Sequence, residues 1–189
     1  MNCVRLFEAR AREHPSRTAL LVPGSPAVTY GQLLANAGAA AEGLRRLGLK
    51  AGDRILLFVP LSPEMYACVI GALSAGITVL LVEPWMRLDR ISHVIQLTNP
   101  RVFVAGLAGR LWGLRNSDVR GIPHWISPAA LLRTPSSFRS EDVATELPGI
   151  LTFTSGSPGA PKGVVRTQGY LLEQHRVLTA ELHLHDHAG

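Results

Sequence analysis

The chain contains 189 residues, of which 47% are hydrophobic and 17% are charged. This balance fits a globular chain that buries a core, and it excludes a disordered or collagen-like polymer. The net charge of +5 admits an anionic partner, but the basic residues are scattered and form no run, so nucleic-acid binding is not expected.

The first quarter of the chain predicts two helices separated by a strand. The first helix covers residues 3–13 and ends at His14-Pro15, and a strand follows over residues 18–22. Thr29 and Gln32 form a T-x-x-Q capping box that opens the second helix, which Gly48 terminates. Apolar residues at helical spacing give this helix one buried face: Leu33, Ala37, Ala40, Leu44 and Leu47.

Residues 65–82 carry no charge and reach the lower limit of transmembrane length. A strand over residues 54–59 precedes them, and Ser62 can cap a helix that has Pro63 at its first position. Gly76 interrupts the apolar stretch, and a β-branched run follows it. We therefore expect a buried helix and then a buried strand over residues 78–82, with no membrane span.

The middle of the chain continues the alternation of helix and strand. The pattern predicts a helix closed by Asn99-Pro100, then a strand, a weaker helix and another strand: residues 88–98, 102–105, 107–116 and 124–126. Residues 133–149 are rich in polar residues and proline and predict an exposed connection. This order is typical of an α/β domain with a largely parallel sheet flanked by helices.

The two cysteines and the N-terminus indicate the compartment. Cys3 and Cys68 are too few for a disulfide framework or a structural zinc site. Charged residues such as Arg5 and Glu8 interrupt any early apolar stretch, so no secretory signal is predicted. We expect a cytoplasmic protein with reduced thiols.

A glycine- and hydroxyl-rich segment, residues 155–163, follows an apolar strand predicted over residues 150–154. Glycines let the backbone approach a ligand closely, and backbone N–H groups of such a loop can converge on an anion. Lys162 adds a charge that can reach a phosphate. The natural ligand is a polyphosphate, with a flexible turn as the alternative. The spacing matches neither a Walker A motif nor a Rossmann G-x-G-x-x-G motif. A helix from about Thr167 follows, with these residues on one face: Leu171, His175, Leu178 and Leu182.

Residues Thr154–Gly163 resemble the T-S-G-[ST]-T-G-x-P-K-G signature of the AMP-binding, adenylate-forming superfamily, with one disagreement in ten positions. Val28-Thr-Tyr-Gly-Gln-Leu33 resembles the early L-T-Y-x-E-L motif of that superfamily, and residues 61–84 resemble its S-x-E…G-x-L-x-A-G…P segment. The chain is therefore identified as a member of the superfamily of acyl-CoA synthetases, fatty-acyl-AMP ligases, peptide-synthetase adenylation domains and luciferases.

The resemblance implies that ATP activates a carboxylic acid as an acyl-adenylate, with Mg²⁺ accompanying ATP and pyrophosphate leaving. In many members coenzyme A then accepts the acyl group. The composition and the resemblance together favour a fatty acid over an amino acid, and an olefin-pathway β-lactone synthetase is an alternative. The residues that would hold the ATP phosphates are Thr154, Ser155, Gly156, Ser157, Gly159, Lys162 and Gly163. We expect no catalytic residue and no metal ligand in this chain.

The chain departs from the superfamily pattern in two respects. Pro158 replaces the usual Thr of the signature, which removes a backbone N–H and a hydroxyl. In addition, the family's adenine, magnesium and ribose motifs and its small C-terminal domain are not found, so residues 1–189 are expected to form an incomplete N-terminal domain that is inactive by itself. A non-catalytic remnant or a nucleotide-binding fragment is the alternative. In a strand, three alternating histidines near the C-terminus would project from one face, as metal ligands do: His183, His185 and His187. We expect a polar loop there. No oligomeric state is indicated.

Overall fold

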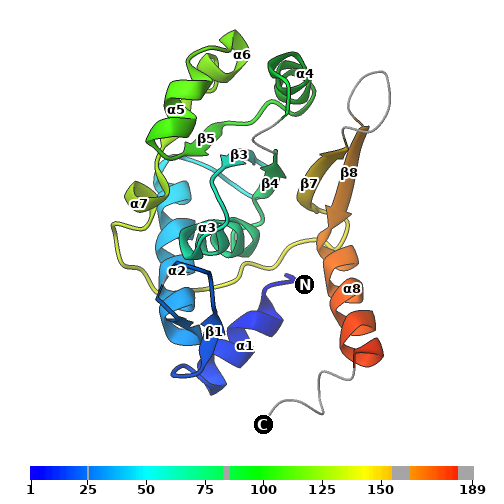
Figure 1. Ribbon diagram of the computed structural model, residues 1–189. Helices are drawn as coiled ribbons and strands as arrows, with labels where there is room; N and C mark the ends of the chain where they lie inside the picture. Colours follow the sequence, from blue (N-terminus) through cyan, green and yellow to red (C-terminus); the bar gives the residue numbers. More distant parts are fainter. Residues whose placement is uncertain (25, 83–85, 155–161, 183–189) are drawn as a thin grey trace.

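A six-stranded sheet forms the centre of the computed structural model, which describes residues 1–24, 26–82, 86–154 and 162–182 (Figure 1). The strand order is β6-β5-β3-β4-β7-β8. The strands are β3 (Arg54–Phe58), β4 (Thr78–Leu81), β5 (Val102–Ala105), β6 (His124–Ile126), β7 (Pro148–Thr154) and β8 (Lys162–Thr167). The first five are parallel to one another, and β8 is antiparallel to β7. The expected α/β class with a largely parallel sheet is confirmed.

The described residues also form eight helices and a separate two-stranded sheet. That small sheet pairs β1 (Thr18–Leu20) with β2 (Val28–Thr29). The helices are α1 (Arg5–Glu13), α2 (Tyr30–Arg46), α3 (Pro63–Ser74), α4 (Leu88–Thr98), α5 (Leu107–Gly113), α6 (Ser117–Arg120), α7 (Pro128–Leu131) and α8 (Gln168–Glu181). The sequence did not predict α6 and α7, which are single turns capped by Asn116 and Ser127.

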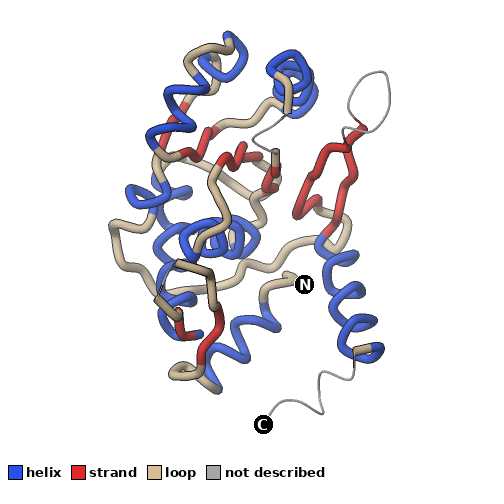
Figure 2. Tube along the Cα trace, viewed as in Figure 1, coloured by secondary structure: helices blue, strands red, loops and turns tan. Residues whose placement is uncertain are grey.

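Helices cover both faces of the parallel strands. On one face Ile55 and Leu57 pack in a buried cluster with residues of α2, α3 and α7. On the other face Leu56 packs in a second cluster with residues of α4, α5 and α6. Because both faces are covered, consecutive residues of β3 are apolar and no polar alternation occurs. Figure 2 shows these layers with the strands in red between the helices.

The local signals read from the sequence operate in the structure. Thr29 accepts a hydrogen bond from the Gln32 backbone N–H, and the Gln32 side chain accepts one from the Thr29 N–H, which completes the capping box of α2. Gly48 follows α2 with φ +78°, a left-handed conformation that favours glycine. Ser62 caps α3, and Pro63 is its first residue. Residues 65–82 form most of α3, the Gly76 stop and β4, as expected. None of the helices among the described residues is long and apolar enough to cross a membrane.

Three expectations need correction. Residues 162–167 form a strand, because hydrogen bonding to β7 extends their backbone. The apolar face predicted for α8 is not buried along its length: Leu171 packs against a buried cluster, but Leu178 and Leu182 are exposed. The connection over residues 133–149 is not wholly exposed, since Phe138 is buried and meets Phe7 edge-to-face at 6.4 Å between ring centroids.

The N-terminal segment lies beside the start of α8 (Figure 1). Asn2 is fully buried, and its amide Nδ2 donates to the backbone oxygens of Leu73, Ser74 and Glu141 at 2.8, 3.1 and 3.2 Å. The Cys3 N–H donates to Oε1 of Gln168 at 2.9 Å, which joins this segment to α8. One buried asparagine therefore connects the chain start, the end of α3 and the segment that leads into β7.

Candidate functional site

The carboxyl ends of β3, β4, β5 and β7 lie along one edge of the sheet, because these strands are mutually parallel. Open α/β sheets bind ligands at this edge. Strand β7 ends there at Thr154, and the glycine-rich segment follows it. The strand that precedes the predicted phosphate site is thus confirmed, and its position in the sheet is one at which ligands bind.

The two ends of the glycine-rich segment are held side by side by the β7–β8 hairpin. Thr154 is the register partner of Lys162. Residues 155–161 connect these two positions and lie outside the described residues. That range includes four of the predicted phosphate-binding residues and the unusual proline: Ser155, Gly156, Ser157, Gly159 and Pro158. The described part of the site therefore consists of the hairpin that carries the segment.

Lys162 and Gly163 begin β8, and the structure separates their roles. Lys162 is exposed, so its ammonium group is available to a ligand at the carboxyl edge. Gly163 pairs with Phe153, and a methyl group at Gly163 would lie 3.2 Å from that ring. Phe153 is buried in the cluster beneath α4. A glycine at position 163 therefore leaves room for the Phe153 ring, a packing role that the sequence did not indicate.

Arg166 is a second cation on the hairpin, one that no motif in the sequence indicated. Its Nη1 donates to the hydroxyl Oγ1 of Thr152 at 2.8 Å. Lys162 and Arg166 are four residues apart on one strand, so their side chains project from the same face. The alternation of Lys162, Val164 and Arg166 was the available signal, and it becomes informative only when these residues are known to be a strand.

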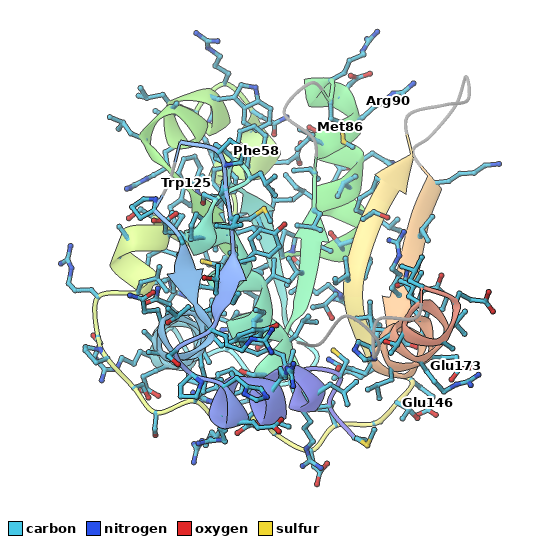
Figure 3. All side chains as sticks on the ribbon, turned by 60° about the horizontal axis from the view of Figure 1, so that its bottom comes forward. Phe58, Met86, Arg90, Trp125, Glu146 and Glu173 are labelled. Atoms are coloured by element: carbon cyan, nitrogen blue, oxygen red, sulfur yellow. The ribbon has the colours of Figure 1, made fainter. Side chains whose placement is uncertain are left out.

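An apolar pocket of about 410 Å³ lies on the same edge. Its walls come from the ends of three parallel strands and from α5: Phe58, Val59, Pro60, Val82, Gly106, Leu107, Ala108, Gly109 and Trp112. The rings of Phe58 and Trp112 are stacked with centroids 4.6 Å apart and an interplanar angle of 11°. The pocket has the size of a small-molecule site, and none of the described residues in its lining is ionisable. Figure 3 shows Phe58, Met86 and Arg90 toward one end of the molecule, and Glu146 and Glu173 toward the other.

The donor set fits a phosphate better than a metal ion. Lys162 supplies positive charge beside the end of β7, whereas Arg166 is the register partner of Ile150 near the start of that strand. Among the described residues, no group of three or more His, Cys, Asp or Glu side chains gathers as a metal-binding cluster. The three histidines of residues 183–187 lie outside the described residues.

The two cysteines have no reactive character. Burial raises the pKa of the Cys3 thiol to about 11 and the pKa of the Cys68 thiol to about 12. Both are free thiols, and a thiol that is protonated at neutral pH is a weak nucleophile. The cysteines are therefore not candidates for nucleophilic catalysis.

Comparison with known families identifies the chain. The model of the AMP-binding enzyme family matches residues 7–187. The chain belongs to the AMP-binding enzyme family. The match includes both strands of the β7–β8 hairpin and the segment between them, so the predicted superfamily membership is confirmed.

Curated relatives of this AMP-binding chain include two kinds of enzyme. A dimodular nonribosomal peptide synthase from Bacillus subtilis is 31% identical over 170 residues, which cover 86% of this chain and 7% of that protein. Acetyl-coenzyme A synthetase from Shewanella baltica is 27% identical over 203 residues, which cover 89% of this chain and 31% of that protein. The chain thus spans about a third or less of the length of these relatives.

Solved structures agree with the fold. A fatty acyl CoA synthetase from Mycobacterium tuberculosis superposes with a TM-score of 0.77 at 25% identity, covering 88% of this chain and 34% of that one. An anthranilate CoA ligase in complex with anthranoyl-AMP gives a TM-score of 0.82 at 19% identity, covering 96% and 36%, which supports the fold alone. The relatives of this chain therefore include both a peptide synthase and a CoA synthetase, and family membership does not select one acid.

Proposed function

We propose that this chain forms the phosphate-binding part of an enzyme that uses ATP to activate a carboxylic acid as an acyl-adenylate. The observation that carries the proposal is the β7–β8 hairpin, which holds Thr154 and Lys162 at the carboxyl edge of the sheet. Between them the sequence carries the family signature, and the family match over residues 7–187 supports the same interpretation.

In this proposal the hairpin binds and orients the phosphates. Backbone N–H groups and hydroxyls of residues 154–163 hold the β- and γ-phosphates, which leave as pyrophosphate when the acid carboxylate attacks the α-phosphorus. The Lys162 ammonium balances the negative charge that accumulates on the leaving group. Mg²⁺ bound with ATP would supply further charge neutralisation. This chain would contribute position and charge, with little proton transfer.

We also propose that residues 1–189 correspond to the first part of the AMP-binding domain, and that further polypeptide supplies the adenine, ribose and acid contacts. A fatty acid is the proposed substrate class, and coenzyme A is the proposed acceptor. The likeness to a fatty acyl CoA synthetase at 25% identity supports this choice. The relatives among peptide synthases favour an amino acid, which is the competing substrate.

Pyrophosphate exchange tests the proposal. Residues 1–189 are fused to the remaining part of a close relative, and acid-dependent ATP–pyrophosphate exchange is measured with fatty acids and amino acids. A charge-assisted contact contributes about 1.5–3 kcal/mol, so Lys162→Ala should lower exchange by about one to two orders of magnitude. Lys50→Ala is the matched control, because Lys50 is exposed, precedes β3 at the opposite edge, and is the only other lysine.

Four outcomes separate the alternatives. Loss of exchange in Lys162→Ala but not in Lys50→Ala supports the assignment of the phosphate site. Equal exchange in both variants contradicts it. Full acid-dependent exchange by residues 1–189 without the fused part would contradict the proposed division of the domain, and no exchange by the unmutated fusion would favour a non-catalytic, nucleotide-binding fragment.

A further inference from the structure

Three leucines form an exposed stripe on α5 and the turn that follows it. Leu107, Leu111 and Leu114 are 77%, 58% and 52% exposed. Their i, i+4, i+7 spacing places them on one face of the helix. The opposite face is buried, since a methyl group at Gly113 would lie 3.0 Å from the rings of Phe103 and Trp125. The stripe therefore points away from the core, and nothing in the described structure covers it.

Arginines flank this leucine stripe. At 3.6 residues per turn, Arg110 and Arg115 fall on opposite sides of it, and both are exposed. Arg120 of α6 donates through Nη1 to the backbone oxygen of Leu114 at 2.7 Å, which places a third cation at the end of the stripe. No acidic residue occurs between Arg90 and Asp118, and the Asp118 carboxylate accepts a hydrogen bond from Gln96.

The stripe is continuous with the apolar pocket. Leu107 belongs to both, because it also lines the pocket, together with Pro60 and Val82. Exposed leucines, an apolar hollow and a rim of arginines therefore form one surface at the carboxyl edge of the sheet. A contiguous apolar surface with a charged rim marks a site of contact with a protein or a membrane.

We propose that α5 docks this protein on an anionic lipid surface, with the leucine stripe inserted among the acyl chains and Arg110, Arg115 and Arg120 at the phosphate level. Short amphipathic helices bind bilayers in this way, through buried apolar area and attraction to anionic headgroups. The arginine rim decides between a lipid surface and a protein partner: it needs a dense negative surface, which anionic headgroups provide.

Vesicle co-sedimentation of the full chain tests this docking. The probes are vesicles of phosphatidylcholine with about one third phosphatidylglycerol, and vesicles of phosphatidylcholine alone. We expect binding to the first and weak binding to the second, and a decrease between about 0.05 M and 0.5 M salt. The double variant Leu111→Ser with Leu114→Ser should lower the partition coefficient about tenfold or more. Arg110→Gln and Arg115→Gln should each lower it about fivefold.

Matched controls keep the result specific. Leu21 is 80% exposed and follows β1, distant from α5, so Leu21→Ser should bind vesicles as the unmutated chain does. Arg139→Gln changes an exposed arginine outside the stripe and should also leave binding unchanged. Circular dichroism confirms that each variant folds, which is expected because every changed side chain is exposed.

The proposal is overturned if anionic vesicles are not bound, or if the double leucine variant binds them as well as Leu21→Ser does. It is also overturned if the unmutated chain is a dimer that the leucine variant converts to a monomer without any vesicle binding, since the stripe would then join two copies. Light scattering measures the mass in the same samples. The outcome does not depend on ATP activation, so it stands or falls separately from the proposed function.

Discussion

Replacing Asn2 tests the most connected polar contact of the fold. Its amide Nδ2 donates hydrogen bonds to three backbone oxygens, and its Oδ1 accepts a hydrogen bond from the Val4 N–H at 3.1 Å. Two of those oxygens accept a second hydrogen bond: the Gly76 N–H donates to the Leu73 carbonyl oxygen, and the Glu141 N–H donates to the Ser74 carbonyl oxygen. Asn2→Ala therefore removes four hydrogen bonds, and the Val4 N–H and the Glu141 carbonyl lose the partner that satisfies them.

The magnitude follows from this inventory. A hydrogen bond contributes about 0.5–1.5 kcal/mol, and a buried group left unsatisfied costs about 1–3 kcal/mol. Asn2→Ala should therefore lower the free energy of unfolding by about 2–4 kcal/mol. Urea denaturation followed by circular dichroism measures it by linear extrapolation. Asn36→Ala, on the partly exposed side of α2, is the control and should stay within about 0.5 kcal/mol.

Asn2→Asp sharpens the test, because it keeps the shape and removes the donors. Near neutral pH its carboxylate would face three carbonyl oxygens in a buried site, so this variant should be less stable than Asn2→Ala. Burial and these oxygens raise the pKa of the new carboxyl in the folded state. The folded state then binds more protons than the unfolded state, so the deficit relative to Asn2→Ala should shrink as the pH falls toward about 5. A loss below about 1 kcal/mol for Asn2→Ala, or an aspartate variant as stable as the alanine variant, would refute this account of the contact.

Two further predictions concern the core and the thiols. Gly71→Ala places a methyl group 2.5 Å from the Ala37 carbonyl oxygen, where α2 crosses α3. The steric cost should exceed the helix-propensity gain of about 1 kcal/mol, so the free energy of unfolding measured in urea should fall by about 1–2 kcal/mol. Gly106→Ala is the control and should be nearly neutral, because its methyl group would meet nothing within 4 Å. Burial raises the pKa of the Cys68 thiol to about 12. This thiol should therefore react slowly with a disulfide reagent at about pH 8 in the folded chain and rapidly in urea. Rapid labelling of Cys68 without urea would contradict its burial.

The sequence alone was sufficient for the elements whose signals are local. The capping box of Thr29 and Gln32, the Ser62-Pro63 start of α3 and the left-handed Gly48 each depend on a few neighbouring residues, and each operates as expected. The parallel sheet was also readable, because strands buried on both faces must be continuously apolar. The position of the proposed phosphate-binding segment after a strand at the carboxyl edge followed from the same pattern.

Only the tertiary structure decided what depends on distant partners. Residues 162–167 carry no strong strand signal and become β8 because β7 offers them hydrogen-bond partners, which also brings Arg166 to Thr152 and gives Gly163 its packing role against Phe153. The burial of Asn2 and the exposure of the α5 leucines are equally invisible in the sequence, where both residue types would be assigned the opposite environment. Hydrogen bonding and burial are settled by which segments meet in space, and a local pattern of residues does not contain that information.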